Sequence, residues 1–331
     1  MTVPLSILDL ATIGRDETAA DSFRATVALA QLAEDAGYRR VWYAEHHNMS
    51  RIASSATSVL IAHVASQTST IRLGAGGVML PNHAPLTIAE QFGTLETLHP
   101  GRIDLGLGRA PGTDQNTMRA LRRDNTSSDT FPRDVQELQG YLRDESLIPG
   151  VKAIPGRGTN VPLYILGSSL FGASLAAALG LPYAFASHFA PDELERAVAT
   201  YRANFQPSDQ LEVPHVIAGV SVIAADSQSE ADEEFLAATR ARVGIIAGRG
   251  RSYSDEEADA ILASPQGAYL RNMMRYAAVG TPRDAVNYLD EFTNHADADE
   301  LIITLPSVTG EGRLRSARLV AEAIHAPTTA G

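Results

Sequence analysis

The hydrophobic positions along the chain alternate between short continuous apolar runs and longer stretches with an apolar residue every three or four positions. Short apolar runs are typical of buried strands, whereas the 3.6-residue period is typical of amphipathic helices. The apolar run VPLSILDL (3–10) is followed by apolar residues at helical spacing between Phe23 and Ala33, and then by a second apolar run from Val41. The chain is therefore expected to begin as a β-α-β unit.

The same alternation continues toward the C-terminus. Eight strands are expected, with helices between them and no Pro/Gly/Ser-rich linker; they begin near residues 3, 41, 71, 102, 161, 182, 214 and 300. Eight β-α units without a linker favour an α/β fold in which residues 1–331 form a single eight-stranded (β/α) TIM barrel. A doubly wound sheet is the alternative, but no G-x-G-x-x-G motif lies between the first strand and its helix, which makes a dinucleotide-binding fold less favoured.

Two connections are longer than barrel loops usually are. They span about 110–160, after the fourth strand, and about 248–280, after the seventh, with the part from Gly248 to Tyr276 expected to be irregular. Structureless connections beyond about 15 residues are usually functional loops or lids. Both insertions follow strands, so both are expected at the face where barrels hold their active sites.

Composition and charge exclude several classes of protein. Hydrophobic residues make up 44% of the 331 positions and charged residues 20%, as in soluble globular proteins. The net charge is −12 and no run of Lys and Arg exceeds two residues, so the basic surface that nucleic acids require is missing. No apolar run reaches the roughly 18 residues of a membrane span, and acidic residues interrupt the N-terminal segment where a secretion signal would need an apolar core, so we expect a cytoplasmic protein without membrane association.

The chain contains no cysteine. Disulfides, thiolate metal sites, iron–sulfur clusters and a cysteine nucleophile are therefore excluded. Any chemistry must come from histidines, carboxylates, hydroxyls, backbone groups or a bound cofactor.

Polar and glycine residues fall where the expected strands end. They are Asp9, Glu45-His46-His47, Gly76-Gly77, Gly108-Arg109, Gly167-Ser168-Ser169 and Ser187-His188. Each has an ordinary structural explanation, since glycine in a strand often permits close packing and serine often caps a helix. Because the C-terminal ends of barrel strands meet at one rim, their clustering nevertheless predicts one active site.

Three of these groups together suit a particular ligand. A glycine and two serines, Ser168 and Ser169, open a helix and present N–H groups and hydroxyls that suit a phosphate. Arg109 supplies a planar guanidinium for the same anion from the neighbouring strand. Gly76 and Gly77 would let a flat ring approach the backbone. A planar ring with a phosphate tail describes flavin mononucleotide (FMN).

At these residues the chain resembles the bacterial luciferase-like flavin monooxygenases, in particular their single-chain branch. The resemblance runs essentially from end to end and is carried by AEHHNMSRIASSATSVLIAHVAS, LGAGGVMLPNHAPLTIAEQFGTLETLHPGRIDLGLGRAPGTD and ILGSSLFGASLAAALGLPYAFASHFAPDEL. It implies an enzyme that uses reduced FMN and O2 to insert one oxygen atom into an organic substrate through a flavin C4a-(hydro)peroxide.

The resemblance also implies roles for single residues. His46 matches the family's catalytic histidine, Gly76-Gly77 its non-prolyl cis peptide under the flavin ring, and Arg109 its phosphate-binding arginine. The phosphate loop matches Ser168, Ser169 and the residues up to Gly172. Two departures are Gly108, where luciferase has a cysteine, and Gly172, where luciferase has a hydroxyl residue; the first puts aldehyde chemistry of the luciferase type in doubt.

Further expectations concern the surroundings of His46. Glu45 or Asp9 is expected to set its tautomer, Asp9 and His188 are expected to line the substrate pocket, and no metal site is expected. The segments 248–280 and 110–130 are the candidate lid and second rim element.

The resemblance and the absence of a dinucleotide fingerprint also predict which proteins this chain interacts with. A separate NAD(P)H-dependent flavin reductase is expected to deliver reduced flavin, and a homodimer is expected to form through the helices near 54–68 and 85–98.

Three other functions remain open on sequence grounds. A metal-dependent hydrolase would use some of the nine histidines, but no His-x-His follows the first strand and no His-x-x-x-His pair lies among the rim residues. A deazaflavin-dependent oxidoreductase of the same fold and a flavin-binding protein without turnover are the others. Aldehydes, fused aromatic polyketides and sulfur compounds are all compatible substrates.

Overall fold

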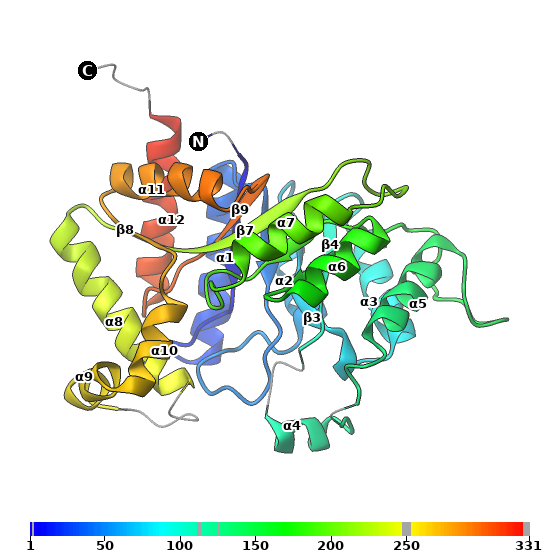
Figure 1. The fold of residues 1–331 in the computed structure, drawn as a ribbon, viewed down its shortest axis with the longest axis horizontal. Coiled ribbons are helices and arrows are strands. Elements are labelled where there is room, and N and C mark those ends of the chain that lie inside the picture. The colour runs from blue at the N-terminus through cyan, green and yellow to red at the C-terminus, as the bar shows by residue number, and fades with distance from the viewer. Residues whose placement is uncertain (2, 111–113, 125, 247–252, 327–331) are drawn as a thin grey trace.

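Eight parallel strands close into a barrel in the computed structural model, which describes residues 1, 3–110, 114–124, 126–246 and 253–326 (Figure 1). β1 pairs with both β2 and β9, and β7 pairs with both β6 and β9, so the ring is complete. The strands of the ring are β1 Leu5–Asp9, β2 Arg40–Tyr43, β3 Arg72–Met79, β4 Ile103–Gly108, β5 Leu163–Gly167, β6 Tyr183–Phe185, β7 Val216–Ala224 and β9 Glu300–Thr304. The predicted barrel and its eight strands are confirmed.

One further strand was not predicted. β8 (Ala277–Gly280) pairs with the second half of β7. Ser221 pairs with Thr304 of β9 and also with Ala277 of β8, so β8 lies on the side of β7 opposite to β9, beyond the short β6. Four small residues carry little hydrophobic periodicity, which explains why the pattern did not predict this strand.

Helices lie between the strands and cover the outside of the barrel. They are α1 Ala19–Asp35, α2 Thr57–Ala65, α3 Pro85–Leu98, α4 Gln115–Ala120, α5 Phe131–Arg143, α6 Leu170–Leu179, α7 Leu194–Asn204, α8 Gln228–Ile246, α9 Asp255–Ala263, α10 Pro265–Met273, α11 Pro282–His295 and α12 Gly310–His325, with a short 3-10 turn, η1, at Leu80–Asn82. No helix in the described part of the chain has both the length and the apolar character needed to cross a membrane.

The second insertion is more regular than expected. Its described residues form α9, α10 and β8 instead of an irregular loop. Ser254 begins α9 with a capping box: its hydroxyl accepts the Glu257 N–H at 3.2 Å, and the Glu257 carboxylate accepts the Ser254 N–H at 3.0 Å. Ser264 is the N-cap of α10, just before Pro265, and its hydroxyl accepts the Gly267 N–H at 3.3 Å. These local start signals, not a long apolar face, determine the two helices.

The first insertion also contains helices, α4 and α5. α5 buries Phe131, Val135, Leu138 and Leu142 on one face, so the stretch after the fourth strand is only partly an irregular loop.

The N-terminal end of the barrel is filled by a buried polar layer. Arg40 lies there between the carboxylates of Asp104 and Glu300, and next to the Tyr164 hydroxyl. Trp42 and other apolar side chains pack above this layer. Figure 1 shows the N-terminus and the end of α12 toward the top of the view and α4, α9 and α10 toward the bottom, so these three inserted helices lie toward the opposite end of the strands, where the candidate site lies.

Candidate active site

Glu45 follows β2 and ties two loops together. Its Oε1 lies 2.8 Å from His47 Nε2 and 2.9 Å from His83 Nε2, and its Oε2 accepts the Met79 N–H at 3.0 Å. Burial alone would raise the pKa of Glu45, but the hydrogen bonds from His47 and His83 and the charge of His83 lower it to about 2. Glu45 is therefore a carboxylate at neutral pH, and both histidines donate to it. Glu45 thereby connects His47, in the loop after β2, with His83 in the loop after β3.

His46, the other histidine of the pair, has different surroundings. Its Nδ1 is buried and has no hydrogen-bond partner among the described residues. Burial lowers the pKa of His46, so its imidazole is neutral at pH 7. Neither carboxylate expected to orient His46 hydrogen-bonds to it within the described part of the chain. Glu45 bonds as described above, and the buried Asp9 accepts from the Ala11 N–H at 2.8 Å and the Thr26 hydroxyl at 2.6 Å.

These bonds assign Asp9 to the packing of the loop after β1 against α1, because its two oxygens are engaged there. Its burial is explained without a substrate, and its place in the substrate pocket stays a prediction.

Gly76 and Gly77 lie within β3, and the peptide bond between them is cis, as the resemblance implies. A Cβ on Gly76 would lie 2.7 Å from Leu8 Cδ1, and a Cβ on Gly77 would lie 2.8 Å from the Gly106 carbonyl oxygen. Packing inside the barrel wall therefore already requires glycine at both positions.

Arg109 and the start of α6 form a site suited to an anion. The Arg109 guanidinium lies over the ring of Phe171, 4.0 Å from its centroid, and forms no ion pair with any described Asp or Glu. Ser169 is the N-cap residue of α6, but its hydroxyl makes no capping hydrogen bond, so no N-cap hydroxyl engages the first-turn N–H groups. A cation beside these N–H groups is typical of phosphate sites.

Gly172, in the same turn, packs against Tyr183. A Cβ at this position would lie 3.3 Å from Tyr183 Cε2, so a side chain here would require a small shift of Tyr183.

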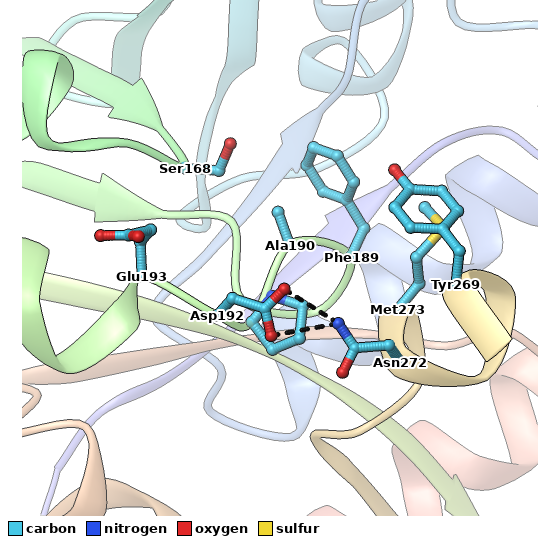
Figure 2. A pocket seen from close by; sticks show the side chains of 9 residues that line it. Ser168, Phe189, Ala190, Asp192, Glu193, Tyr269, Asn272 and Met273 are labelled. Atoms are coloured by element: carbon cyan, nitrogen blue, oxygen red, sulfur yellow. Dashed lines mark hydrogen bonds between the residues drawn. The ribbon is translucent and has the colours of Figure 1, made fainter.

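A cavity of about 180 Å³ lies between the end of β5 and the inserted helix α10 (Figure 2). Ser168 lines it from the β5 side, Phe189 from the loop after β6, and Tyr269 and Met273 from α10. Asn272 Nδ2 donates to both oxygens of Asp192, at 3.1 and 3.0 Å, which fastens α10 to the loop after β6. The second insertion thus covers part of the predicted rim.

His188 follows β6 and lies against the backbone of β7. A Cβ on Gly219 would lie 2.4 Å from His188 Nδ1, and this nitrogen is buried with no partner among the described residues. Burial, together with the charges of Arg242 and His46, lowers the pKa of His188 to about 3. His46 and Arg242 are thus both close enough to act on the same neutral imidazole.

Sequence reasoning missed two of these side chains, His83 and Arg242. His83 follows η1 after β3, so its place at a strand end was the only available signal. Arg242 lies in α8, and arginines in helices are ordinarily exposed.

Glu45, His47 and His83 also form a possible metal site. Their ligand atoms lie within 4.8 Å of one another, a spacing at which a metal ion could be held. The metal alternative therefore has a candidate site that the sequence motifs did not indicate.

Solved structures share the fold of this chain. MsnO8, in its apo form, is 36% identical, superimposes with a TM-score of 0.88, and the match covers 97% of this chain and 98% of that one. Two more distant structures show likeness of fold alone. The oxygenating constituent of 3,6-diketocamphane monooxygenase from Pseudomonas putida, in complex with FMN, is 15% identical with a TM-score of 0.68 and 97% and 98% coverage. The coenzyme F420-dependent tetrahydromethanopterin reductase from Methanopyrus kandleri is 18% identical with a TM-score of 0.67 and 98% coverage of both chains.

Sequence comparison shows the family. The profile described as luciferase-like monooxygenase matches residues 3–298. A protein of Escherichia coli K12 named luciferase-like monooxygenase is 46% identical over 321 residues, which cover 96% of each chain. The N-acetyl-S-alkylcysteine monooxygenase of Bacillus subtilis is 33% identical, with 98% of this chain and 99% of that one covered. The chain therefore belongs to the luciferase-like monooxygenase family.

Proposed function

We propose that this chain is a flavin-dependent monooxygenase that uses reduced FMN and O2 to insert one oxygen atom into an organic substrate. Family membership supports monooxygenase chemistry. The observation that carries the choice of cofactor is the anion site beside α6, where Arg109 has no carboxylate partner among the described residues and no hydroxyl caps the helix. This donor set fits the phosphate of FMN.

Within this proposal the phosphate is held by Arg109, by the hydroxyls of Ser168 and Ser169, and by backbone N–H groups up to Gly172. Gly76-Gly77, which has no side chains, would let the flat flavin ring approach the backbone. When bound, reduced FMN supplies the two electrons that activate O2. His46 has a neutral imidazole and an unpartnered Nδ1, so it can accept a proton from, or return one to, a group that it contacts. Glu45 acts indirectly: its hydrogen bonds hold the loop that carries His46 in place.

The proposed chemistry needs an enclosure that limits the access of water. α10 fits this role because Asn272 and Arg275 both bond to Asp192 in the loop after β6. The lid expected at 248–280 thus corresponds in part to a helix fastened by polar contacts. The expected second rim element, 110–130, contains α4.

Two partners belong to the same proposal, together with a cytoplasmic location. A separate NAD(P)H-dependent flavin reductase would supply reduced flavin, and steady NADH oxidation by the purified chain with FMN would contradict this. A homodimer would form through α2 and α3, where Val59 is 68% exposed and Leu98 63% exposed, and light scattering would measure its mass.

The test is an anaerobic titration of the chain with reduced FMN, followed by rapid mixing with oxygenated buffer while absorbance is recorded. We expect binding and a persistent absorbance spectrum that differs from those of both reduced and oxidised FMN. His46→Ala should shorten its lifetime or abolish substrate oxidation, whereas His325→Ala, exposed at the end of α12, should not. If reduced FMN does not bind, or reoxidises at the rate of free flavin, the proposal fails. Tight binding of reduced deazaflavin coenzyme alone would favour the hydride-transfer alternative.

A further inference from the structure

Arg242, near the end of α8, has a guanidinium that no carboxylate neutralises in the described part of the chain. Its Nη1 donates to the thioether sulfur of Met274 at 3.1 Å, and its Nε is buried with no hydrogen-bond partner there. The segment 247–252 that follows α8 reads AGRGRS and contains no acidic residue. A thioether is only a weak acceptor. The described protein groups therefore meet little of the hydrogen-bonding capacity of this cation.

The contrast with Arg240 on the same helix shows that this is unusual. Arg240 lies two residues earlier and forms ion pairs with Asp259 and, at 3.0 Å, with Asp255. Removing a guanidinium from water without an anionic partner is unfavourable, and burial lowers the pKa of Arg242. A cation that the fold leaves uncompensated is explained if a bound anion completes its environment.

The surroundings of Arg242 place it on the reacting side of the barrel mouth. Its charge acts on His188, which follows β6, and lowers the pKa of that histidine. Arg109, by contrast, follows β4 and stacks on Phe171 of α6. His188 is neutral at pH 7, because its pKa is lowered to about 3 mainly by burial. Arg242 therefore supplies a positive charge near His188, whereas Arg109 lies against α6.

The groups around Arg242 are otherwise largely apolar or aromatic. Met274 is buried beside it, and Tyr269 is close enough for its hydroxyl to act on the Arg242 charge. Tyr269, Met273 and Phe189 line the cavity of Figure 2. Such surroundings suit an organic molecule with one anionic group and an apolar remainder.

We propose that Arg242 binds the carboxylate of the organic substrate, so that the enzyme selects carboxylic acids that have an apolar, oxidisable portion. This inference rests on the proposed function, because it assigns a substrate class to that site. Arg242 is a specificity-determining residue in it: its planar fork pairs with the carboxylate and orients the rest of the molecule toward His46.

The binding test uses benzoate and benzamide, which have nearly the same shape and differ in charge. Their affinities for the purified full chain are measured by calorimetry or by saturation-transfer NMR. We expect the wild type and Arg240→Gln to prefer benzoate about tenfold or more, and Arg242→Gln to lose this preference. If Arg242→Gln does not fold, Arg242→Lys keeps the charge without the fork and should reduce the preference several-fold. A wild type without any preference, or an unchanged preference in the Arg242 variant, would overturn the proposal.

A second comparison separates the substrate anion from the flavin phosphate. Reduced FMN and reduced riboflavin differ only in the phosphate, and their binding is measured anaerobically. Arg109→Gln should lose the preference for FMN, whereas Arg242→Gln should retain it. If Arg242→Gln loses it as well, Arg242 is a phosphate ligand and the inference is wrong. If Arg109→Gln retains it, the proposed phosphate site fails, while the benzoate comparison still decides the role of Arg242.

Discussion

Replacing Arg40 by methionine should remove the cation from the buried polar layer at the N-terminal end of the barrel. The Arg40 side chain is 1% exposed, and those of Asp104 and Glu300 are both 0% exposed. Arg40 Nη1 donates to Asp104 at 2.8 Å and to the Tyr164 hydroxyl at 2.7 Å, and its Nη2 donates to Glu300 at 3.1 Å. Methionine keeps most of the volume, so the substitution mainly tests charge.

The expected loss of unfolding free energy depends on the partners that Asp104 and Glu300 keep when Arg40 is replaced. Breaking a buried ion pair by removing one partner typically costs about 3–5 kcal/mol. Asp104 keeps its ion pair with Arg72, and Glu300 keeps His215 at 3.4 Å, so neither carboxylate is left entirely alone. We therefore expect about 3–4 kcal/mol, a large part of the 5–15 kcal/mol that stabilises most proteins.

The loss should depend on pH. In the wild type, burial opposes ionisation of Glu300, but the His215 hydrogen bond and the charge of Arg40 lower its pKa. Without Arg40, burial should raise that pKa above the unfolded value of about 4.3. A raised carboxyl pKa destabilises the fold at neutral pH, and the penalty declines as pH falls through it. The difference between variant and wild type should therefore be smaller at pH 5 than at pH 7.

The assay is equilibrium unfolding in urea at both pH values, followed by circular dichroism and by the fluorescence of the single tryptophan, Trp42. Arg24→Met is the matched control, because Arg24 is 72% exposed and pairs only with Asp21; it should cost less than about 1 kcal/mol. A loss below about 1 kcal/mol for Arg40→Met, or an equal loss at the two pH values, would refute this account of the layer.

Three other changes test single contacts. Glu45→Gln should cost on the order of 2–3 kcal/mol at pH 7, because the pKa of Glu45 is lowered to about 2; the cost should fade as pH drops from about 5 toward 2, and a pH-independent loss in denaturant unfolding would contradict this. Gly219→Ala should lower the free energy of unfolding by about 1–3 kcal/mol, because the new Cβ overlaps with His188, and this loss should shrink when His188 is also replaced by alanine. An additive double-mutant cycle would show that the introduced methyl group and His188 do not collide. Thr281→Ala should cost about 1 kcal/mol by removing the N-cap of α11, with Thr281→Ser close to wild type in its melting temperature.

The barrel could be predicted from the sequence because each ring strand is a compact apolar run separated from the next by a helix. β8 could not, since it is a short strand of small residues that exists only because β7 extends beyond β6. α9 and α10 have weak hydrophobic patterns, but the serines before them were visible start signals that pattern reasoning left unused.

The clustering of the rim residues could be predicted, because the C-terminal ends of parallel strands meet at one face. The hydrogen-bond partners of these residues could not be predicted. Glu45 is adjacent to His46 in sequence, yet it bonds to His47 and to His83, which follows β3. Which of two neighbouring histidines points toward a carboxylate depends on the local turn, and the hydrophobic pattern carries no information about that. Arg242 reaches the site from the far end of α8, where sequence shows only one more arginine on a charged helix.

The arginines inside and around the barrel show how pairing separates structural from functional charges. Arg40 has two buried carboxylates and a tyrosine hydroxyl as partners, so its charge is compensated in the folded chain. Arg109 and Arg242 lie at the opposite end of the strands, where Arg109 contacts the Phe171 ring and Arg242 donates to the Met274 thioether. Arg109 is exposed, so water can solvate its charge, whereas the buried Nε of Arg242 has no described partner. Under our proposals both guanidiniums would pair with anions that arrive with ligands, Arg109 with the cofactor phosphate and Arg242 with the substrate carboxylate.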